Sequence, residues 1–437
     1  MSVPIFLNSC TVIPLQVCNL FCIIRLGRED VVSLSLRQFL SQLIRYKNID
    51  QEMNILAVCT WYIPQFIGGV ETRMGSICQS LSSEHRVKVF CRNKEPFETV
   101  DHVGSVEVVR QKFSFPKLRL MKNILSHRQD YFNGFDINFD FDLCLSTSFG
   151  YTLGIKKKYP SKKLKILIPA RLNYLYSPNI PHIGTEERLW RYFDCAVTGY
   201  MEKRALTLAD KIIVSSKPVY HSIVRECGIE KSKLILLPQG TDLKRFSGKR
   251  DRSILKSFGI ADDKFVILAV SRLVLEKNIP LLIKSMKYMK DGAVCLIVGG
   301  GREKHFLEKL AEDENVRNKI IFTGETPEVE RYYAAADIFA HPATYEGFGN
   351  VLIEAMAYGL PCVALDFNPD AGIHVATREI INDDVGFRVA NNERAFSAAM
   401  NKLKDDRQLR ESMSKSARYR AKVNYSLVDY VHNILAA

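Results

Sequence analysis

The sequence has no C-x-x-C pair, although its 437 residues include 11 cysteines. An odd number of scattered cysteines gives no framework of disulfide pairs, and a structural zinc site needs cysteines paired at short spacing. The missing pattern therefore argues against a disulfide-rich secreted domain and against a zinc module. We expect the protein to work in a reducing compartment such as the cytoplasm.

A clear targeting or membrane-spanning segment is also missing. Residues 2–24 carry no charge, but they hold two prolines and several polar side chains, and Arg25 and Arg28 follow this stretch rather than precede it. A signal peptide has the opposite charge order, and a spanning helix tolerates fewer polar groups. We interpret residues 1–52 as an extension and expect the functional chain to begin near Met53.

Acidic residues are scarce in the first part of the chain. Residues 1–250 hold 36 Lys and Arg against 22 Asp and Glu, a net charge of +14, whereas residues 251–437 hold 25 against 26. A basic excess can face an anionic membrane, an anionic acceptor or a nucleic acid, or it can simply be solvated. No basic stretch is interleaved with aromatic residues, so we expect no nucleic-acid partner.

The chain has the length of two domains and the composition of a globular protein, with 47% hydrophobic and 25% charged residues. The pattern of residues 54–59, 70–81 and 87–90 predicts a strand, a helix and a strand, and such units then repeat. This alternation is typical of parallel sheets. We predict one α/β domain at 53–247 and a second at 254–415, joined by a short charged linker.

Two ligand-binding motifs are incomplete. Asp140 and Asp142 form a D-x-D pair, but a metal-binding pair of this kind follows an apolar strand, whereas Asp142 precedes one. We therefore interpret them as solvated or strand-capping side chains and expect no metal site. Residues 299–301 are three glycines after an apolar strand, but no further glycine stands at the spacing of a dinucleotide-binding loop. They make only a weak dinucleotide signature.

Residues 344–359 carry the most specific pattern, Thr-Tyr-Glu-Gly-Phe-Gly-Asn-Val-Leu-Ile-Glu-Ala-Met-Ala-Tyr-Gly. The apolar residues 336–340 before them predict a buried strand, and Gly347 and Gly349 then break the chain before a helix that starts near Asn350. The first N–H groups of such a helix and the positive end of its dipole converge in front of it. A phosphate binds well at such a point.

Glu346 and Glu354 flank this anion site. Glu346 lies in the loop, and Glu354 lies about one turn inside the helix, with a side chain that tilts back toward the N-terminus. A carboxylate beside a phosphate is unfavourable unless it accepts hydrogen bonds from other groups, such as sugar hydroxyls. The combination indicates a nucleotide-sugar. Two solvated glutamates beside an ordinary turn would give the same sequence pattern.

Basic residues and a second glycine turn complete the candidate site. Arg272 and Lys277 follow the apolar strand 265–270, at the carboxyl edge where open parallel sheets bind ligands. An arginine and a lysine can neutralise a diphosphate there, although such a pair is often only surface charge. Gly68 and Gly69 stand at the mouth of the first predicted helix, where a ligand can approach the backbone closely.

The stretch from Glu346 to Glu354 resembles the E-x7-E signature of retaining glycosyltransferases of family 4. The resemblance covers the chain from about Met53 to the C-terminus. It implies the GT-B architecture, in which two Rossmann-like, doubly wound parallel-sheet domains face a central cleft. It also implies that residues 416–437 form a helix that packs back on the first domain.

This resemblance implies transfer of a sugar from a nucleoside diphosphate to a hydroxyl, with retention of configuration and without a metal or other cofactor. Arg272 and Lys277 would stabilise the leaving diphosphate, Glu346 would hold the donor sugar and Glu354 the ribose. The remaining donor-binding positions implied are Gly347, Phe348, Gly349, Asn350, Val351, Gly68, Gly69, Thr323 and Gly324.

The chain departs from the family pattern at two places. Family members commonly have a histidine after a strand of the first domain, where this sequence has Arg171, and the nearest histidine is His182. Either residue is a candidate contact for the donor or the acceptor. Family members also often carry an acidic residue at the position of Gly300.

The resemblance favours UDP over GDP as the donor nucleotide, because UDP is the commoner one in the family. We expect a saccharide or lipid-linked acceptor in the synthesis of cell-surface polysaccharide or lipopolysaccharide. The basic first domain suggests a cytoplasmic protein in peripheral contact with the anionic inner face of the plasma membrane. Two alternatives stay open: a GT-B sugar-nucleotide epimerase, and a non-catalytic subunit that binds a nucleotide-sugar.

Overall fold

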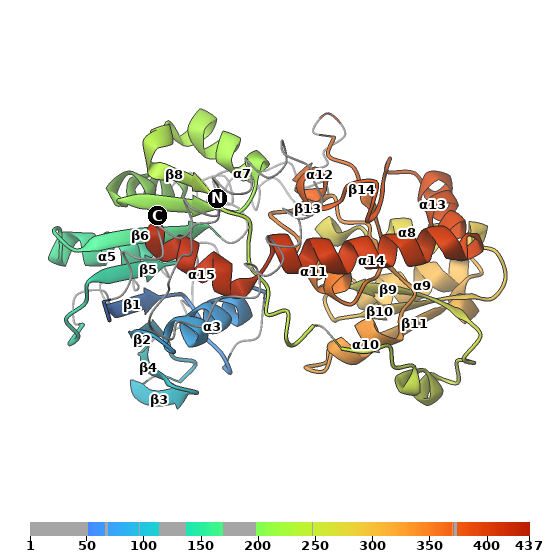
Figure 1. Cartoon of the computed structure of the whole chain (residues 1–437), viewed down its shortest axis with the longest axis horizontal. Coiled ribbons are helices and arrows are strands. Elements are labelled where there is room, and N and C mark those ends of the chain that lie inside the picture. The colour runs from blue at the N-terminus through green and yellow to red at the C-terminus, as the bar shows by residue number, and fades with distance from the viewer. Residues whose placement is uncertain are drawn as a thin grey trace, which may run out of the picture. The chain divides into compact units, whose positions relative to one another are not determined.

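The computed structural model describes residues 51–65, 69–95, 97–112, 137–168, 198–246, 248–368, 370 and 374–437. Residues 53–435 group as one compact unit, which contains two large sheets of mainly parallel strands (Figure 1). Gly68, Arg171 and His182, three of the predicted site residues, lie outside the described residues.

The first sheet has eight strands in the order β3-β4-β2-β1-β5-β6-β7-β8. All neighbouring pairs are parallel except β3 with β4, which are antiparallel at one edge. The strands are β1 (Asn54–Val58), β2 (Arg86–Arg92), β3 (Thr99–Val103), β4 (Val106–Gln111), β5 (Leu143–Ser146), β6 (Lys163–Ile168), β7 (Lys211–Val214) and β8 (Leu234–Leu236). The strand order reverses between β1 and β5, which is a topological switch point of an open α/β sheet.

Helices cover both faces of this sheet. Alternate residues of β1 enter the two cores: Ile55 and Ala57 pack with α3 (Gly69–Leu81) and α15 (Leu427–Ala436), and Leu56 and Val58 pack on the opposite side. That side is covered by α5 (Phe149–Lys158), by the helical residues 198–208 and by α7 (Lys217–Ser222). The unbroken apolar run of β1 therefore reflects a strand buried on both faces.

The second sheet has six strands, all parallel, in the order β11-β10-β9-β12-β14-β16. The strands are β9 (Phe265–Val270), β10 (Ala293–Val298), β11 (Ile320–Gly324), β12 (Ile338–His341), β14 (Cys362–Leu365) and β16 (Gly386–Val389). A separate two-stranded ladder pairs β13 (Tyr345–Glu346) with β15 (His374–Val375). The ladder fixes the course of the loop that carries Glu346.

The second sheet also has helices on both faces. One core contains Val266 and Leu268 of β9 together with residues of α10 (Glu330–Ala335), α11 (Asn350–Ala357) and α14 (Arg407–Asn424). The opposite core contains Ile267 and Ala269 of β9 with residues of α8 (Ile279–Ser285), α9 (Lys304–Asp313) and α13 (Glu393–Asp405). The short helix α12 (Thr377–Ile380) follows β15. Short helical turns occupy Ile223–Cys227, Lys231–Lys233, Ser253–Phe258, Leu275–Lys277, Met286–Tyr288 and Arg317–Lys319.

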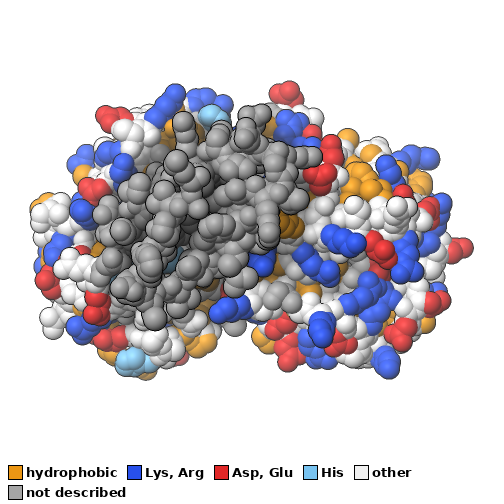
Figure 2. Space-filling model, viewed as in Figure 1, with side chains coloured by type: hydrophobic (Ala, Val, Ile, Leu, Met, Phe, Trp, Pro, Cys, Tyr) orange, Lys and Arg blue, Asp and Glu red, His pale blue; other side chains and the backbone are white. Residues whose placement is uncertain are grey.

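The basic helix α14 braces α11, the helix that starts at the predicted anion site. Its small buried residues Ala417 and Ala421 allow close packing in the core that contains α11. Arg418 donates to the carbonyl of Tyr358 at the C-terminal end of α11, at 3.0 Å, and Arg420 donates to the carbonyl of Ile380 at 2.8 Å. Lys and Arg side chains are frequent on the face of the second domain that carries α14 (Figure 2). Part of this basic character thus satisfies helix-end carbonyls.

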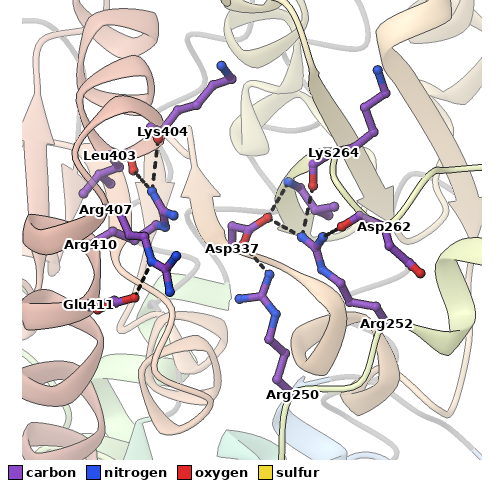
Figure 3. A network of polar contacts seen from close by, with 11 residues as sticks. Arg250, Arg252, Asp262, Lys264, Asp337, Leu403, Lys404, Arg407, Arg410 and Glu411 are labelled. Atoms are coloured by element: carbon purple, nitrogen blue, oxygen red, sulfur yellow. Dashed lines mark hydrogen bonds and ion pairs between the residues drawn. The ribbon is translucent and has the colours of Figure 1, made fainter.

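The predicted linker is attached to the second sheet by Asp337 (Figure 3). Asp337 precedes β12, is 8% exposed, and accepts hydrogen bonds from Arg250 at 2.5 Å and Arg252 at 2.6 Å. It also accepts from the backbone N–H of Val266, at 2.8 Å, at the start of β9. These contacts lie at the N-terminal ends of the strands, the edge opposite the predicted site.

Most of the strand and helix predictions are confirmed within the described residues. The pattern at 54–59 is β1, that at 70–81 is α3, and the run 336–340 overlaps β12, followed by α11 from Asn350. Asp142 caps a strand as interpreted, because its carboxylate accepts the N–H of Asn54 at 2.8 Å.

Candidate active site

The turn before α11 requires glycine at position 349. Gly349 has a φ of +103°, in the left-handed region that side chains rarely adopt, and a Cβ there would lie 3.1 Å from Cδ1 of Leu352. Among the described residues, no side chain caps the N-terminus of α11. The helix therefore presents its positive end and the N–H groups of its first residues without a capping side chain in front of them.

Lys277 and Glu346 form an ion pair beside this helix start. The ammonium group of Lys277 donates to Oε2 of Glu346, and the two side chains are 14% and 20% exposed. Burial by itself would raise the pKa of Glu346, but Lys277, with weaker contributions from His341 and Arg272, holds this pKa below its usual value. Glu346 is therefore an anion at neutral pH.

Two loops of the second domain are joined at this ion pair. The backbone N–H of Thr344 donates to the carbonyl of Glu276 at 3.0 Å, and the hydroxyl of Thr344 lies 3.3 Å from the same carbonyl oxygen. Lys277 thus approaches Glu346 from the turn after β9. The sequence predicted both residues for the same ligand, but gave no indication that they contact each other.

Arg272 lies on the same turn and is far more exposed. Its side chain is 72% exposed, and its guanidinium lies 3.7 Å from the carboxylate of Glu276. A weak, solvated contact of this kind leaves a long side chain free to change rotamer. Arg272 can therefore turn toward a ligand without breaking a buried interaction.

Two of the three glycines after β10, Gly299 and Gly301, serve backbone packing. A Cβ on Gly299 would lie 1.9 Å from the carbonyl oxygen of Ser271, and one on Gly301 would lie 2.3 Å from that of Leu273. Leu273 in turn donates its N–H to the carbonyl of Gly300, at 2.7 Å. The glycines allow the loop that carries Arg272 to lie directly on the end of β10, so their weak dinucleotide signature has a structural explanation.

Thr323 and Gly324 end β11 beside this loop. The N–H of Gly299 donates to the carbonyl of Gly324 at 2.9 Å, and Thr323 Oγ1 lies 3.5 Å from the carbonyl of Ile297. The ends of β9, β10, β11 and β12 all lie at one edge of the parallel sheet. Most of the predicted second-domain site residues are thus carried by the turns at this carboxyl edge.

Glu354 has a different environment from Glu346. Its carboxylate accepts a hydrogen bond from the hydroxyl of Tyr333, at 2.8 Å. Burial raises the pKa of Glu354 to about 7, although the hydrogen bond from Tyr333 partly opposes this shift. Tyr333 itself stacks on Tyr358, with ring centroids 5.9 Å apart, and meets Phe246 edge-on at 5.8 Å.

The first domain contacts the loop that carries Glu346. The hydroxyl of Ser216, directly before α7, donates to the carbonyl of Gly347 at 2.8 Å, and the N–H of Lys217 donates to the carboxylate of Glu379 at 2.9 Å. Gly69, which opens α3, is described, and a Cβ there would have no neighbour within 4 Å. Open space at that position leaves room for a ligand or a side chain.

Sequence reasoning missed three site residues: His341, Tyr333 and Ser216. His341 ends β12 and is buried, and it lies 3.9 Å from Glu346. A polar residue at the carboxyl end of a buried parallel strand is a signal that could have identified His341. Tyr333 and Ser216 contact the site only through the tertiary fold, so no local pattern marks them.

None of the described helices combines the length and apolar character needed to span a bilayer.

The two doubly wound sheets define the GT-B fold, and the predicted fold class is confirmed. The structure of sucrose-phosphate synthase from Thermosynechococcus elongatus superimposes with a TM-score of 0.70, covering 88% of this chain and 97% of that one at 19% sequence identity. At this identity the similarity establishes the architecture alone.

Residues 251–420 match the family model of glycosyl transferases group 1. One relative is the N-acetylgalactosamine-N,N'-diacetylbacillosaminyl-diphospho-undecaprenol 4-alpha-N-acetylgalactosaminyltransferase of Campylobacter jejuni, 30% identical over 53% of this chain and 60% of that protein. Another is the UDP-Gal:alpha-D-GlcNAc-diphosphoundecaprenol alpha-1,3-galactosyltransferase of Escherichia coli, 26% identical over 48% and 55%. The chain spans little more than half the length of these curated relatives. It thus combines the GT-B fold with a second domain that matches glycosyl transferases group 1.

Proposed function

We propose that the protein is a retaining glycosyltransferase of family 4, which transfers a hexose or N-acetylhexosamine from a nucleoside-diphosphate sugar to a hydroxyl of its acceptor. The observation that carries this proposal is the Lys277–Glu346 ion pair beside the uncapped start of α11. A cation, an anion and a set of backbone N–H groups converge there, and a sugar diphosphate needs all three.

The diphosphate is the part of the donor that the helix start would hold. Backbone N–H groups from Gly349 to Val351 would face its oxygens, with Lys277 and Arg272 supplying positive charge. Lys277 is already in place, and Arg272 is exposed enough to turn inward. The absence of a side chain at Gly349 leaves room for close approach.

The two glutamates would hold the sugars at either end of the diphosphate. Glu346, whose pKa lies below its usual value, would accept hydrogen bonds from hydroxyls of the donor sugar. Glu354, held by Tyr333, would accept from the ribose hydroxyls. Neither carboxylate is proposed as a nucleophile.

The proposed reaction breaks the bond between the anomeric carbon and the phosphate oxygen. The acceptor hydroxyl attacks the anomeric carbon from the same face, and the leaving phosphate oxygen takes the hydroxyl proton. Negative charge grows on the diphosphate as the bond breaks, and the cations and N–H groups stabilise that charge more than they stabilise the bound substrate. No metal is part of the proposal.

We further propose UDP rather than GDP as the donor nucleotide, and a saccharide or lipid-linked acceptor in the synthesis of cell-surface polysaccharide or lipopolysaccharide. The names of the Campylobacter jejuni and Escherichia coli relatives both contain a diphospho-undecaprenol acceptor, and the second also names UDP-Gal. The net charge of +14 on residues 1–250 supports a cytoplasmic protein in peripheral contact with an anionic membrane face.

The experiment that tests this function has two stages. A thermal-shift screen against UDP- and GDP-sugars finds the donor, since a ligand that binds only the folded state raises the unfolding temperature. The donor is then incubated with lipid-linked and saccharide acceptors, and the anomeric configuration of the product is read by NMR. Transfer with retention of configuration is the expected result.

Lys277→Ala provides the matched test of the site, with Lys287→Ala as the control, because Lys287 is an exposed lysine that pairs with Glu314 elsewhere on the domain. We expect Lys277→Ala to lower kcat by about 100- to 1000-fold, the usual loss when one stabilising group is removed from a developing anion. Free epimerised sugar as the product would instead indicate an epimerase. Donor binding without any turnover would indicate a binding subunit.

A further inference from the structure

His341 is a buried side chain that no part of the proposed chemistry uses. It is the last residue of β12, it is 2% exposed, and its ring stacks on Phe339 with centroids 6.3 Å apart at an interplanar angle of 18°. Among the described residues its Nε2 atom has no hydrogen-bond partner. A buried polar atom without a partner is unusual in a folded protein, so this one calls for an explanation.

The unpartnered Nε2 of His341 lies near the carboxylate of Glu346. It is 3.9 Å from Oε2 of Glu346, too far for a hydrogen bond and near enough for a small movement of the carboxylate to make one. Lys277 donates to that same oxygen atom. Histidine and lysine thus approach one carboxylate oxygen, and of these two side chains it is the lysine that bonds to it.

The imidazole of His341 is neutral at physiological pH. Burial lowers its pKa to about 4, with Glu346 opposing this shift and Lys277 adding to it. A neutral imidazole carries a single N–H, so it can donate one hydrogen bond without bringing a second positive charge to the site. Arg272 also lowers the pKa of Glu346, but its side chain is mostly exposed to solvent.

We propose that His341 is a positioning residue that replaces Lys277 as the partner of Glu346 once a donor is bound. This inference rests on the proposed function. The diphosphate attracts Lys277, and Glu346 would then be left as a largely buried, unpaired anion. The Nε2–H of His341 donates to Glu346 at that stage and keeps the carboxylate directed at the hydroxyls of the donor sugar.

Three substitutions at one position test this role. In His341→Gln the amide nitrogen reaches about as far as Nε2, in His341→Asn it reaches only as far as Nδ1, and His341→Phe keeps the ring without a donor. We expect the Asn and Phe variants to lower kcat with the nucleotide-sugar by about 10- to 100-fold, as for other hydrogen bonds to a charged group. The Gln variant should stay within about threefold of the wild type.

Binding of the free nucleoside diphosphate separates positioning from general damage to the fold. This probe lacks the sugar that Glu346 holds, so its affinity should be the same in the wild type and in all three variants. Equal activity in the Gln and Asn variants, or full activity in the Phe variant, would overturn the proposal. Equal loss of nucleoside diphosphate binding and of kcat would show that His341 only supports the fold.

A measurement without turnover tests the contact independently of the proposed function. Lys277→Ala removes the competing partner, so the empty variant should form the His341–Glu346 hydrogen bond. In ¹⁵N NMR the Nε2–H of His341, assigned by its absence in His341→Gln, should become protected from exchange with water. If Nε2 remains unprotected in Lys277→Ala, the proposal is wrong. If the Nε2–H is protected but the protein transfers no sugar, the His341–Glu346 contact is supported and the proposed glycosyl transfer is rejected.

Discussion

Glu346 and Glu354 lie on the same loop-and-helix unit, but the regions around them have opposite effects on the carboxyl group. Glu346 pairs with the cation of Lys277, and its pKa is held below the usual value. Glu354 accepts a hydrogen bond from the hydroxyl of Tyr333, and burial raises its pKa to about 7. Seven intervening residues separate a carboxylate that is ionised at neutral pH from a group that titrates near neutrality.

This difference shows how one loop-and-helix unit can present two carboxylates with different tasks. A carboxyl group with a lowered pKa keeps its charge at neutral pH. A carboxyl group with a pKa near 7 is ionised only in part, so a ligand that donates hydrogen bonds to it also shifts its protonation. The pair can therefore be separated by experiments that respond to charge.

Glu346→Gln should have the largest effect of the substitutions that compare the two glutamates, because we expect it to lose turnover. Glutamine keeps the shape but removes the charge that orients the donor sugar and balances Lys277. We expect kcat to fall by about 100-fold or more, with nearly unchanged binding of the free nucleoside diphosphate. Steady-state kinetics with the donor found in the thermal-shift screen measure this.

Glu354→Gln is the matched substitution. If Glu354 holds the ribose in both the bound substrate and the transition state, its loss raises KM more than it lowers kcat. The same pattern in both variants would mean that the two carboxylates do not have separate tasks.

The two substitutions should also change stability in opposite directions. Between pH 4.5 and about 7 the folded protein keeps a proton on Glu354 that the unfolded chain has lost, so this residue lowers stability as the pH rises. At pH 8 we expect Glu354→Gln to gain up to about 3 kcal/mol in the free energy of unfolding, and to gain little at pH 5. Urea denaturation of the ligand-free proteins at the two pH values measures both quantities.

Glu346 changes the free energy of unfolding with pH in the opposite direction, because its pKa is lowered in the folded state. Its stabilising contribution is fully present above the pKa that Glu346 has in the unfolded chain. This contribution is lost as the pH falls through the pKa that Glu346 has in the folded protein. Glu346→Gln should therefore lose about 1 to 3 kcal/mol at pH 8, less than for a fully buried ion pair because both side chains are partly exposed. A stabilised Glu346→Gln, or a destabilised Glu354→Gln at pH 8, would contradict the comparison.

Donor affinity should depend on pH through Glu354 and not through Glu346. Ribose hydroxyls donate to the ionised carboxylate, and a pKa of about 7 leaves that form in the minority at pH 6. We expect the affinity for the nucleotide-sugar to rise about tenfold between pH 6 and pH 8. Isothermal titration calorimetry measures this, and Glu354→Gln, which has no titrating group there, serves as the flat control.

The sequence patterns were sufficient for the sheets, the glycine turn and the start of α11, because strands buried on both faces leave continuous apolar runs. They did not reveal the Lys277–Glu346 contact, since the two residues are 69 positions apart and meet only once β9 and β12 are neighbours. The shifted pKa of Glu354 was also beyond local reasoning, because it depends on burial beside Tyr333. The glycines at 299–301 were a weak ligand signature, and the packing against Ser271 and Leu273 explained two of them, Gly299 and Gly301.

Tyr333→Phe should produce the smallest effect and test the region around Glu354 alone. The hydroxyl of Tyr333 donates to Glu354 at 2.8 Å and favours its ionised form, so removing it should raise the pKa of Glu354 further. The phenylalanine ring preserves the packing against Tyr358 and Phe246. We expect the donor affinity at pH 7 to fall by about two- to tenfold, and the rise of affinity with pH to move to higher pH. A weaker affinity with an unmoved pH profile would show that Tyr333 orients Glu354 without tuning its charge.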